Sequence, residues 1–293
     1  MNTPGFWRSN KTLFGVLAAV IVLSIIGVLS MGQVPFVRTT LSGLTLGALY
    51  FMVAAGLTLI FGMMGVLNFA HGALYMLGAY FSFSILQSIG SFWLSLLAAP
   101  LAVAGIGMLI ERFFLRKVHA YGHAHELLIT FGIAYIIEEL VKITWGNQPL
   151  LVVLPPALSG SMNFLGIQYP VYRLFILGVS VLVFILLFTF LFKTRIGIIV
   201  RAAVANKQMT DALGFNVPLI FLLLFGVGAW LAGLAGVIGG PYLITNPGMA
   251  ATIIIDLFVV VVVGGLGSVP GALIASLLIG WLQSFGILFL PQF

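Results

Sequence analysis

Three long stretches of this 293-residue sequence contain no aspartate, glutamate, lysine or arginine: residues 39–110, 212–255 and 257–293. An α-helix that crosses a bilayer needs about 20 mostly apolar residues, so the first stretch alone has room for about three crossings. Charged residues make up only 6% of the chain, whereas soluble domains carry about 25%. So few charges cannot cover a water-facing surface, and the sequence therefore predicts an all-α, polytopic membrane helix bundle.

Apolar runs separated by glycine, proline and charged residues predict about eight to ten transmembrane helices, some of them interrupted or half-length. The predicted spans are residues 13–31, 41–61, 72–89, 92–110, 127–145, 174–192, 218–238, 252–263 and 272–290. No segment has the composition of a separate soluble domain, so we expect residues 1–293 to form a single transmembrane domain. The longer connections are a basic loop at 193–216 and a proline-rich loop at 146–172, where repeated prolines would break any helix.

Lysine and arginine gather in loops that would share one side of the membrane. If the N-terminus is cytoplasmic, nine of these residues fall on the cytoplasmic side and only two, Arg38 and Arg173, fall outside. This bias follows the positive-inside rule, so loop 193–216 is expected in the cytoplasm and loop 146–172 outside. The basic residues form no dense patch with interleaved aromatic residues, so the net charge of +6 indicates a lipid bilayer as partner and no nucleic acid.

Four ionisable residues lie within or beside predicted spans: Glu138, Glu139, Lys142 and Asp256. Charged groups in a bilayer are costly, and they mark either mutual pairing or a transport pathway. Glu138 and Lys142 are four residues apart on one helix face, which predicts an ion pair near the external interface. A role in the pathway or in partner docking is the alternative. Asp256 stands alone, and either it caps the interfacial end of its span or it serves a function.

Polar residues also interrupt the apolar stretch between the second and third predicted spans. Asn68 and His71 either satisfy backbone groups where the chain breaks between helices or line the substrate pathway. A lone histidine in lipid is costly, so this one should face protein or water. Thr58 is a further candidate for the pathway.

His119, His123 and His125 stand beside Glu126 in a predicted cytoplasmic loop. Their spacing is compatible with metal ligation, but a solvated loop is the favoured interpretation, and no metal site is expected. The sequence has no G-x-x-x-x-G-K-[ST] phosphate loop, no H-E-x-x-H motif and no G-x-S-x-G motif. We therefore expect no cofactor and no enzyme activity in this chain.

Small residues recur at a spacing of four in several spans, including Gly43 with Gly47 and Gly236 with Gly240. This spacing lets helices approach closely in lipid. It predicts tight packing within the chain or, alternatively, a contact with another subunit.

The basic loop contains a predicted amphipathic helix from Arg201 to Leu213. Ala202, Ala205 and Met209 would share one side of this helix, and Gly214 would end it. A short helix between two spans suits docking onto a cytoplasmic partner, although an ordinary interfacial helix has the same pattern.

Three parts of the chain carry distinctive short motifs. The first part comprises A-G-L-T-L-I-F-G at 55–62, G-V-L-N-F-A-H-G at 65–72 and L-Y-M-L-G-A-Y at 74–80. The second part is the loop segment 201–217, and the third is G-G-L-G-S-V-P-G-A at 264–272. These segments resemble, in the same order, the signatures of the permease subunits of branched-chain amino acid ABC transporters. The chain length is similar to that of the shorter of the two permease subunits.

The resemblance implies a permease subunit of an ATP-driven importer, which moves branched-chain or related amino acids across the bacterial inner membrane by alternating access. It implies three kinds of partner: a second permease subunit, two cytoplasmic ABC ATPase subunits and an external solute-binding protein. The family also includes carriers of urea and short amides. A passive channel or secondary transporter for such a small polar solute is the alternative function, and a membrane enzyme is a third.

The resemblance also assigns residues to roles. Coupling to the ATPase falls on Arg201, Ala202, Lys207, Asp211, Ala212 and Gly214, and a structural or gating role falls on Gly264, Gly265, Gly267 and Gly271. Where related loops carry an acidic residue, this sequence reads Asn206-Lys207-Gln208, which leaves the choice of ATPase partner open.

Overall fold

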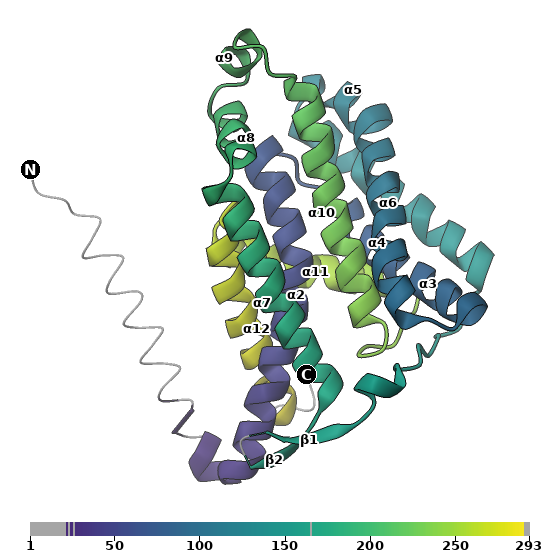
Figure 1. Ribbon diagram of the computed structural model, residues 1–293, viewed down its shortest axis with the longest axis vertical. Coiled ribbons are helices and arrows are strands. Elements are labelled where there is room, and N and C mark those ends of the chain that lie inside the picture. Colours follow the sequence, from purple (N-terminus) through teal and green to yellow (C-terminus); the bar gives the residue numbers. More distant parts are fainter. Residues whose placement is uncertain (1–21, 23, 26, 165, 290–293) are drawn as a thin grey trace, which may run out of the picture.

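The computed structural model describes residues 22, 24, 25, 27–164 and 166–289, so most of the first predicted span, 13–31, lies outside the described residues. Within them the chain is almost entirely helical (Figure 1). The helical elements are α2 Gln33–Met64, α3 Ala70–Ile89, α4 Phe92–Ile110, η1 Glu111–Leu115, α5 Arg116–Val118, η2 His119–Tyr121, α6 His123–Trp145, η3 Pro156–Leu158, α7 Val171–Lys193, α8 Arg195–Ala205, α9 Lys207–Ala212, α10 Val217–Gly239, α11 Met249–Gly264 and α12 Val269–Phe289. Two strands, β1 Ser161–Phe164 and β2 Ile167–Pro170, form an antiparallel hairpin.

Six of the described helices are long and apolar enough to cross a membrane: α2, α3, α4 with its continuation to Val118, α7, α10 and α12. α11 is apolar but has only 16 residues, and α6 carries Glu138, Glu139 and Lys142 in its second half. The predicted all-α, polytopic membrane bundle with some short helices is therefore confirmed. The chain is a multi-pass membrane protein.

The two longer connections lie at opposite ends of the bundle. Figure 1 shows α8 and α9 at one end and the β1–β2 hairpin at the other, and we name these the α8–α9 end and the hairpin end. The hairpin lies inside the predicted proline-rich loop, 146–172, whose prolines stand at element edges: Pro156 begins η3 and Pro170 ends β2. A hydrogen bond from Leu150 N to Thr245 O, 2.8 Å long, ties this loop to the connection between α10 and α11.

The central helix α2 packs along α12 through facing glycines. A methyl group built on Gly43 would lie 2.7 Å from Cα of Trp281, and one on Gly47 would lie 2.6 Å from the carbonyl oxygen of Ser276. Gly280 of α12 faces α2 in turn, because a methyl group there would lie 2.6 Å from Cα of Gly47. The two backbones gain close van der Waals contact, the main attraction available between helices in lipid. Gly43 and Gly47 therefore make their close approach within the chain.

Glycines also bring α10 into close contact with α3. A methyl group on Gly78 would lie 2.7 Å from Cα of Gly233, and one on Gly236 would collide with the carbonyl oxygen of Tyr75. Gly240 differs, because a methyl group there would meet its nearest neighbour, a side-chain atom of Val152, at 3.3 Å. Of the predicted pair, Gly236 makes the close contact and Gly240 does not.

A glycine-rich turn joins α11 to α12. Gly265 and Gly267 have φ of +89° and +86°, a conformation that residues with a Cβ atom rarely adopt. Gly264 and Gly271 face each other so closely that neither has space for a side chain. Gly267 rests on α2, because a methyl group there would lie 2.9 Å from Cα of Gly62. The turn is thus both sharp and pressed against the central helix.

The single helix predicted from Arg201 to Leu213 is wrong, because the chain breaks at Asn206 into α8 and α9. Asn206 has extended backbone angles, φ −153° and ψ 95°, and its side-chain oxygen accepts a hydrogen bond from Met209 N at 2.9 Å. It is therefore the N-cap of α9, a role for which asparagine is among the best residues. Gly214, with φ +89°, follows α9 as the predicted stop.

Substitution of Gly280 by alanine tests the α2–α12 contact. A new methyl group must push α2 and α12 apart, so we expect a loss of stability of about 1–3 kcal/mol. Gly286 lies on the same helix with no neighbouring atom within 4 Å of an added Cβ, and alanine there should be neutral or stabilise by up to about 1 kcal/mol. Thermal unfolding of the purified protein, followed by fluorescence-detected size exclusion, measures both. Equal melting temperatures for the two variants would contradict the contact.

Candidate functional site

A cavity of about 530 Å³ opens between α2, α3, α11, α12 and the connection from α10 to α11. Its polar lining comes from Tyr50, Tyr75, Tyr242, Asn246, Thr252, Asp256 and Gln283. The remainder of the lining is mostly aliphatic. In a chain with so few charges, this mixture of one carboxylate, several hydroxyl and amide groups and apolar walls is typical of a small-molecule site.

A hydrogen-bonded group sits on one wall of this cavity. Tyr50 Oη lies 2.7 Å from Oδ2 of Asp256 and 2.8 Å from the side chain of Gln283. The tyrosine hydroxyl has a single proton, which the carboxylate attracts most strongly, so Tyr50 donates to Asp256. Oε1 of Gln283, at 2.8 Å, is a second acceptor beside the same hydroxyl. One carboxylate oxygen is thereby held in place from α2.

Asp256 carries a charge that no basic residue balances. Among the ion pairs of the described residues, none involves Asp256. It lies seven residues after Met249, the first residue of α11, whose first turn has no acidic residue, so it caps no helix. The capping interpretation is therefore wrong. An unpaired carboxylate among apolar helices is costly and points to a functional role.

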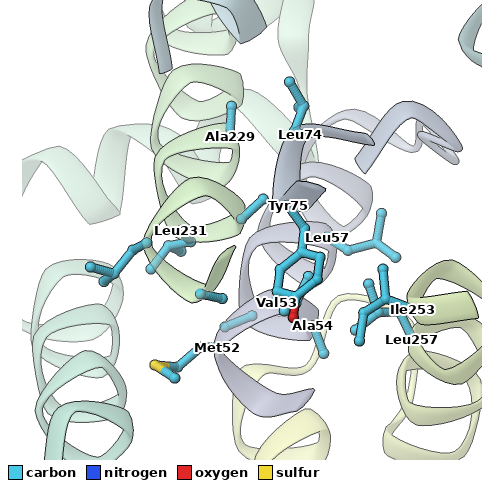
Figure 2. Close-up of a cluster of buried hydrophobic side chains, with 14 of the residues drawn as sticks. Met52, Val53, Ala54, Leu57, Leu74, Tyr75, Ala229, Leu231, Ile253 and Leu257 are labelled. Carbon is cyan, nitrogen blue, oxygen red and sulfur yellow. The ribbon is translucent and has the colours of Figure 1, made fainter. Parts of the chain in front are cut away.

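Tyr75 extends from α3 toward the same cavity. Figure 2 shows its ring among Val53 and Ala54 of α2 and Ile253 of α11. The side chain is 1% exposed, and its hydroxyl has no hydrogen-bond partner among the described residues. Gly239 leaves the space that this hydroxyl occupies, because a methyl group there would lie 2.5 Å from Tyr75 Oη. A buried hydroxyl without a partner is rare and requires an explanation.

The rim of the cavity at Tyr242 lies close to the hairpin end of the bundle. The guanidinium carbon of Arg173 lies 5.4 Å from the ring centre of Tyr242 and 5.8 Å from that of Tyr169. Tyr169 belongs to β2, and its hydroxyl lies 2.9 Å from Thr45 Oγ1 of α2. The rim at Tyr242 is thus held next to the hairpin, whereas Asp256 lies deeper, beside the midpoint of α2.

The three predicted pathway residues do not line this cavity. Thr58, Asn68 and His71 are all completely buried near the junction of α2 and α3. His71 Nε2 lies 3.0 Å from the carbonyl oxygen of Val53, and Asn68 Oδ1 accepts a bond from Ala70 N at 3.0 Å. Each of the three also has one polar atom without a partner in the described chain: Thr58 Oγ1, Asn68 Nδ2 and His71 Nδ1. Their role in the pathway stays a prediction.

The predicted ion pair on α6 is present. Lys142 Nζ lies 2.9 Å from Glu138 Oε1 and also 2.8 Å from Glu139 Oε1. The lysine therefore bridges both carboxylates near the hairpin end of α6, and the three residues satisfy one another.

The α8–α9 end carries two further acidic anchors. Arg116 holds the buried Glu111 with two bonds, Nη2 to Oε2 at 3.0 Å and Nε to Oε1 at 3.2 Å. Glu126, 1% exposed, receives His119 Nδ1 at 2.5 Å and His123 Nδ1 at 3.1 Å. His125 does not join this group. No set of three potential ligands in the described residues is arranged to hold a metal ion.

Two cation–π contacts join the predicted coupling segment, residues 193–216, to different membrane helices. The guanidinium of Arg201, on α8, lies 5.2 Å from the ring centre of Phe192 on α7. The ammonium of Lys207, on α9, lies 5.6 Å from the ring centre of Phe221 on α10. Such cation–π contacts stabilise exposed sites by about 0.5–1 kcal/mol. Of the other predicted coupling residues, Ala202, Asp211 and Ala212 are exposed, as is Gly214.

The α7–α8 corner brings these two helices into close contact. Thr194 caps α8 by accepting a bond from Gly197 N at 3.0 Å. A side chain at Gly197 would collide with the carbonyl oxygens of Phe190 and Leu191. The first turn of α8 therefore packs directly on the end of α7.

Sequence reasoning identified Asp256 but missed the other polar residues that line the cavity with it. Tyr50, Tyr75 and Gln283 come from three different helices, and their convergence depends on how those helices pack. A signal was nevertheless present, because Gln283 is a strongly hydrogen-bonding side chain in the otherwise apolar stretch 272–290.

Substitution of Arg116 tests the ion pair between Arg116 and Glu111 at the α8–α9 end. Arg116→Ala leaves Glu111, which is 3% exposed, as an unpaired buried carboxylate, and should destabilise the protein by about 3 kcal/mol. Glu111→Gln leaves Arg116, which is 39% exposed, in contact with water, and should cost less than about 1 kcal/mol. Thermal unfolding of the purified variants measures both.

The double variant Glu111→Gln with Arg116→Ala is the control. Arg116 also donates to the carbonyl oxygen of Pro218 at 3.0 Å, and this bond is lost in both the single and the double variant. If the double variant is as unstable as Arg116→Ala alone, the stranded carboxylate is not the cause.

The fold and the cavity define a class: a multi-pass membrane protein whose helices border a small, open, mostly apolar site. Comparison with known proteins gives the family. Residues 39–292 match the family described as branched-chain amino acid transport system / permease component, and the chain belongs to this family.

Several curated proteins are similar to the chain over most of its length. The high-affinity branched-chain amino acid transport system permease protein BraD of Pseudomonas aeruginosa is 32% identical over 268 residues, 86% of each chain. The corresponding permease protein LivH of Escherichia coli is 32% identical over 261 residues, 84% of each chain. The permease protein LivM of Escherichia coli is 27% identical over 270 residues, which cover 83% of this chain and 62% of LivM. No solved structure matches the chain.

Proposed function

We propose that this chain is a permease subunit of an ATP-driven importer that translocates branched-chain or related amino acids. The observation that carries the proposal is the family match across residues 39–292, together with relatives named as branched-chain amino acid permeases. The 530 Å³ cavity supports it, since its volume falls in the range of about 300–1,000 Å³ usual for small-molecule sites.

The energy for transport comes from other chains under this proposal. The sequence contains no phosphate-binding loop, and its relatives are named as transport permeases, which supports the proposal that ATP is hydrolysed on separate subunits. Two cytoplasmic ATPase subunits would bind at the α8–α9 end. A second permease subunit would complete the pathway, which the similarity to both LivH and LivM supports. A solute-binding protein would deliver the amino acid at the hairpin end.

The orientation follows from the basic residues. Lys193, Arg195, Arg201 and Lys207 gather at the α8–α9 end, which the positive-inside rule places in the cytoplasm. The hairpin end is then outside, the N-terminus is cytoplasmic, and residues 1–293 form one transmembrane domain in the bacterial inner membrane.

We infer that the coupling segment, 193–216, transmits ATPase movement through its two anchors. Two contacts pass a displacement of α8 to α7: the close backbone contact at Gly197 and the cation–π contact of Arg201 with Phe192. The cation–π contact of Lys207 with Phe221 passes a displacement of α9 to α10. α7 and α10 can thus respond to one docking event.

The buried polar atoms of Thr58, Asn68 and His71 support an alternating-access mechanism. Each atom without a partner costs about 1–3 kcal/mol when it is kept from water. A second conformation in which α2 and α3 separate would give these atoms water or substrate as partners. The glycine turn at 264–271, pressed against Gly62 of α2, is the element that we propose to act as the gate.

Uptake into proteoliposomes tests the proposed function. Vesicles that contain both permease subunits and the ATPases should accumulate leucine only with ATP and the binding protein present. Vesicles with the permease subunits alone should show no accumulation, because the chain has no energy source. Equal leucine or urea flux without ATPase subunits would instead indicate a passive channel or a secondary transporter.

Substitution of Gly214 tests the coupling segment. Gly214 has φ +89° and no neighbouring atom within 4 Å, so Gly214→Trp strains the backbone after α9 and adds bulk to the docking surface. We expect ATP-driven uptake to fall by at least about tenfold, a loss of 1.4 kcal/mol or more in coupling. Gly122→Trp is the matched control, because Gly122 has φ +94° and equally open surroundings but lies outside the coupling segment. Normal uptake by the Gly214 variant would refute the coupling role.

A further inference from the structure

We propose that Asp256 binds the α-ammonium group of the transported amino acid, inside the cavity between α2, α3, α11 and α12. This inference rests on the proposed function, and it identifies the chemical group of the substrate that the permease itself recognises.

The first argument is charge. The described residues give Asp256 no lysine, arginine or histidine within ion-pair distance, and its surroundings are the apolar faces of membrane helices. A carboxylate in such a place is stabilised by a cation. Every zwitterionic amino acid carries one, and an ammonium with three N–H donors is a strong hydrogen-bonding match for a carboxylate.

The second argument is orientation. Tyr50 donates to Oδ2 of Asp256 at 2.7 Å, and among the described residues no donor is bonded to the other oxygen, Oδ1. Asp256 is partly exposed where it lines the cavity. The hydroxyl of Tyr50 therefore fixes the carboxylate while leaving it capacity to accept a further bond. Tyr50 therefore acts as a positioning residue for the carboxylate of Asp256, which is the binding group.

The third argument is the unpartnered hydroxyl of Tyr75. This side chain is 1% exposed, lines the same cavity from α3, and has no partner for its hydroxyl among the described residues. A movement that uncovers this hydroxyl, now buried beside Gly239, would let a substrate in the cavity give it the hydrogen bond it lacks. Structural packing alone does not explain why a tyrosine, and not a phenylalanine, stands there.

The walls fit the rest of a branched-chain amino acid. Leu46, Met249, Ile253 and Ile287 line the cavity and offer aliphatic contact to an aliphatic side chain. Urea and short amides are neutral and have neither a cation for Asp256 nor an aliphatic chain for these walls. The cavity thus favours amino acids over the small polar solutes that other carriers accept.

The absence of cysteine from the chain permits a direct test of cavity occupancy. Thr252 is exposed on the cavity rim, one helical turn before Asp256, so Thr252→Cys places a single thiol there. The intact transporter is labelled with N-ethylmaleimide, a neutral reagent, and modification of this subunit is followed by its mass. L-leucine should slow labelling by a factor of about ten when its concentration is ten times its Kd. A thiol at Ser159, exposed beyond the cavity in the loop 146–172, should not be protected.

Two comparisons assign this protection to the ammonium group. The deaminated analogue 4-methyl-2-oxopentanoate should give no protection, because it has the same side chain but no cation. In the Thr252→Cys background, Asp256→Asn should raise the leucine concentration for half-protection by at least about tenfold. Glu139→Gln removes the same charge from a residue paired with Lys142 on α6, and it should leave protection unchanged. Asp256→Glu keeps the carboxylate and should retain protection in part.

The possible results separate the inference from the function on which it rests. Equal protection by the keto acid and by leucine, or an unchanged half-protection concentration in Asp256→Asn, would overturn the ammonium site. Failure of leucine to protect Thr252→Cys, in a transporter that still drives leucine uptake with ATP, would also overturn it while leaving the function intact. Absence of ATP-driven leucine uptake by the unmodified transporter would remove the proposed function itself. If Asp256→Asn does not fold, Tyr50→Phe replaces it, with a smaller rise expected in the same concentration.

Discussion

The structure depends on the direct contact of helix backbones along α2. In a bilayer the hydrophobic effect does not drive one apolar helix onto another, so association relies on van der Waals contact and on the few available hydrogen bonds. Gly43 and Gly47 bring α2 against α12, and Gly62 brings it against the α11–α12 turn. Each of these contacts has no Cβ atom on the α2 side, and at Gly62 the partner, Gly267, has none either. The cavity exists because α11 and α12 are held to α2 in this way at two separated points.

Some polar atoms of the bundle have hydrogen-bond or ion-pair partners, and others have none. At the α8–α9 end and on α6, every carboxylate of the described chain is matched by a base or a histidine, except the exposed Asp211. Between the membrane helices and in the α10–α11 connection the opposite holds. Six residues of the described chain each keep a buried polar atom without a partner, namely Thr58, Asn68, His71, Tyr75, Tyr80 and Thr245, and Asp256 keeps a charge without a counterion. Such departures from what the fold alone requires are expected at functional sites.

Much of the fold could be predicted because its signals are local. Charge-free stretches located most spans, glycine spacing indicated the close contact at Gly43 and Gly47, and the i, i+4 spacing of Glu138 and Lys142 predicted their ion pair. The break at Asn206 was missed because the amphipathic pattern continues across it, and only the N-cap geometry of that asparagine interrupts the helix. The site was only partly predictable. Asp256 is conspicuous in the sequence, but the polar residues that line the cavity with it are brought together from α2, α3 and α12 by packing that no short motif encodes.

The hydrogen bond from Leu150 to Thr245 has a consequence for how the surface of loop 146–172 can change. Both of its atoms belong to the backbone, so substitution of either side chain, other than by proline at 150, leaves the link between this loop and the cavity rim in place. Leu151 and Val153 come after Leu150 in the chain, are highly exposed, and take no part in this hydrogen bond. Over evolutionary time the loop can therefore adopt new surface chemistry for a new partner while its connection to the cavity is inherited unaltered.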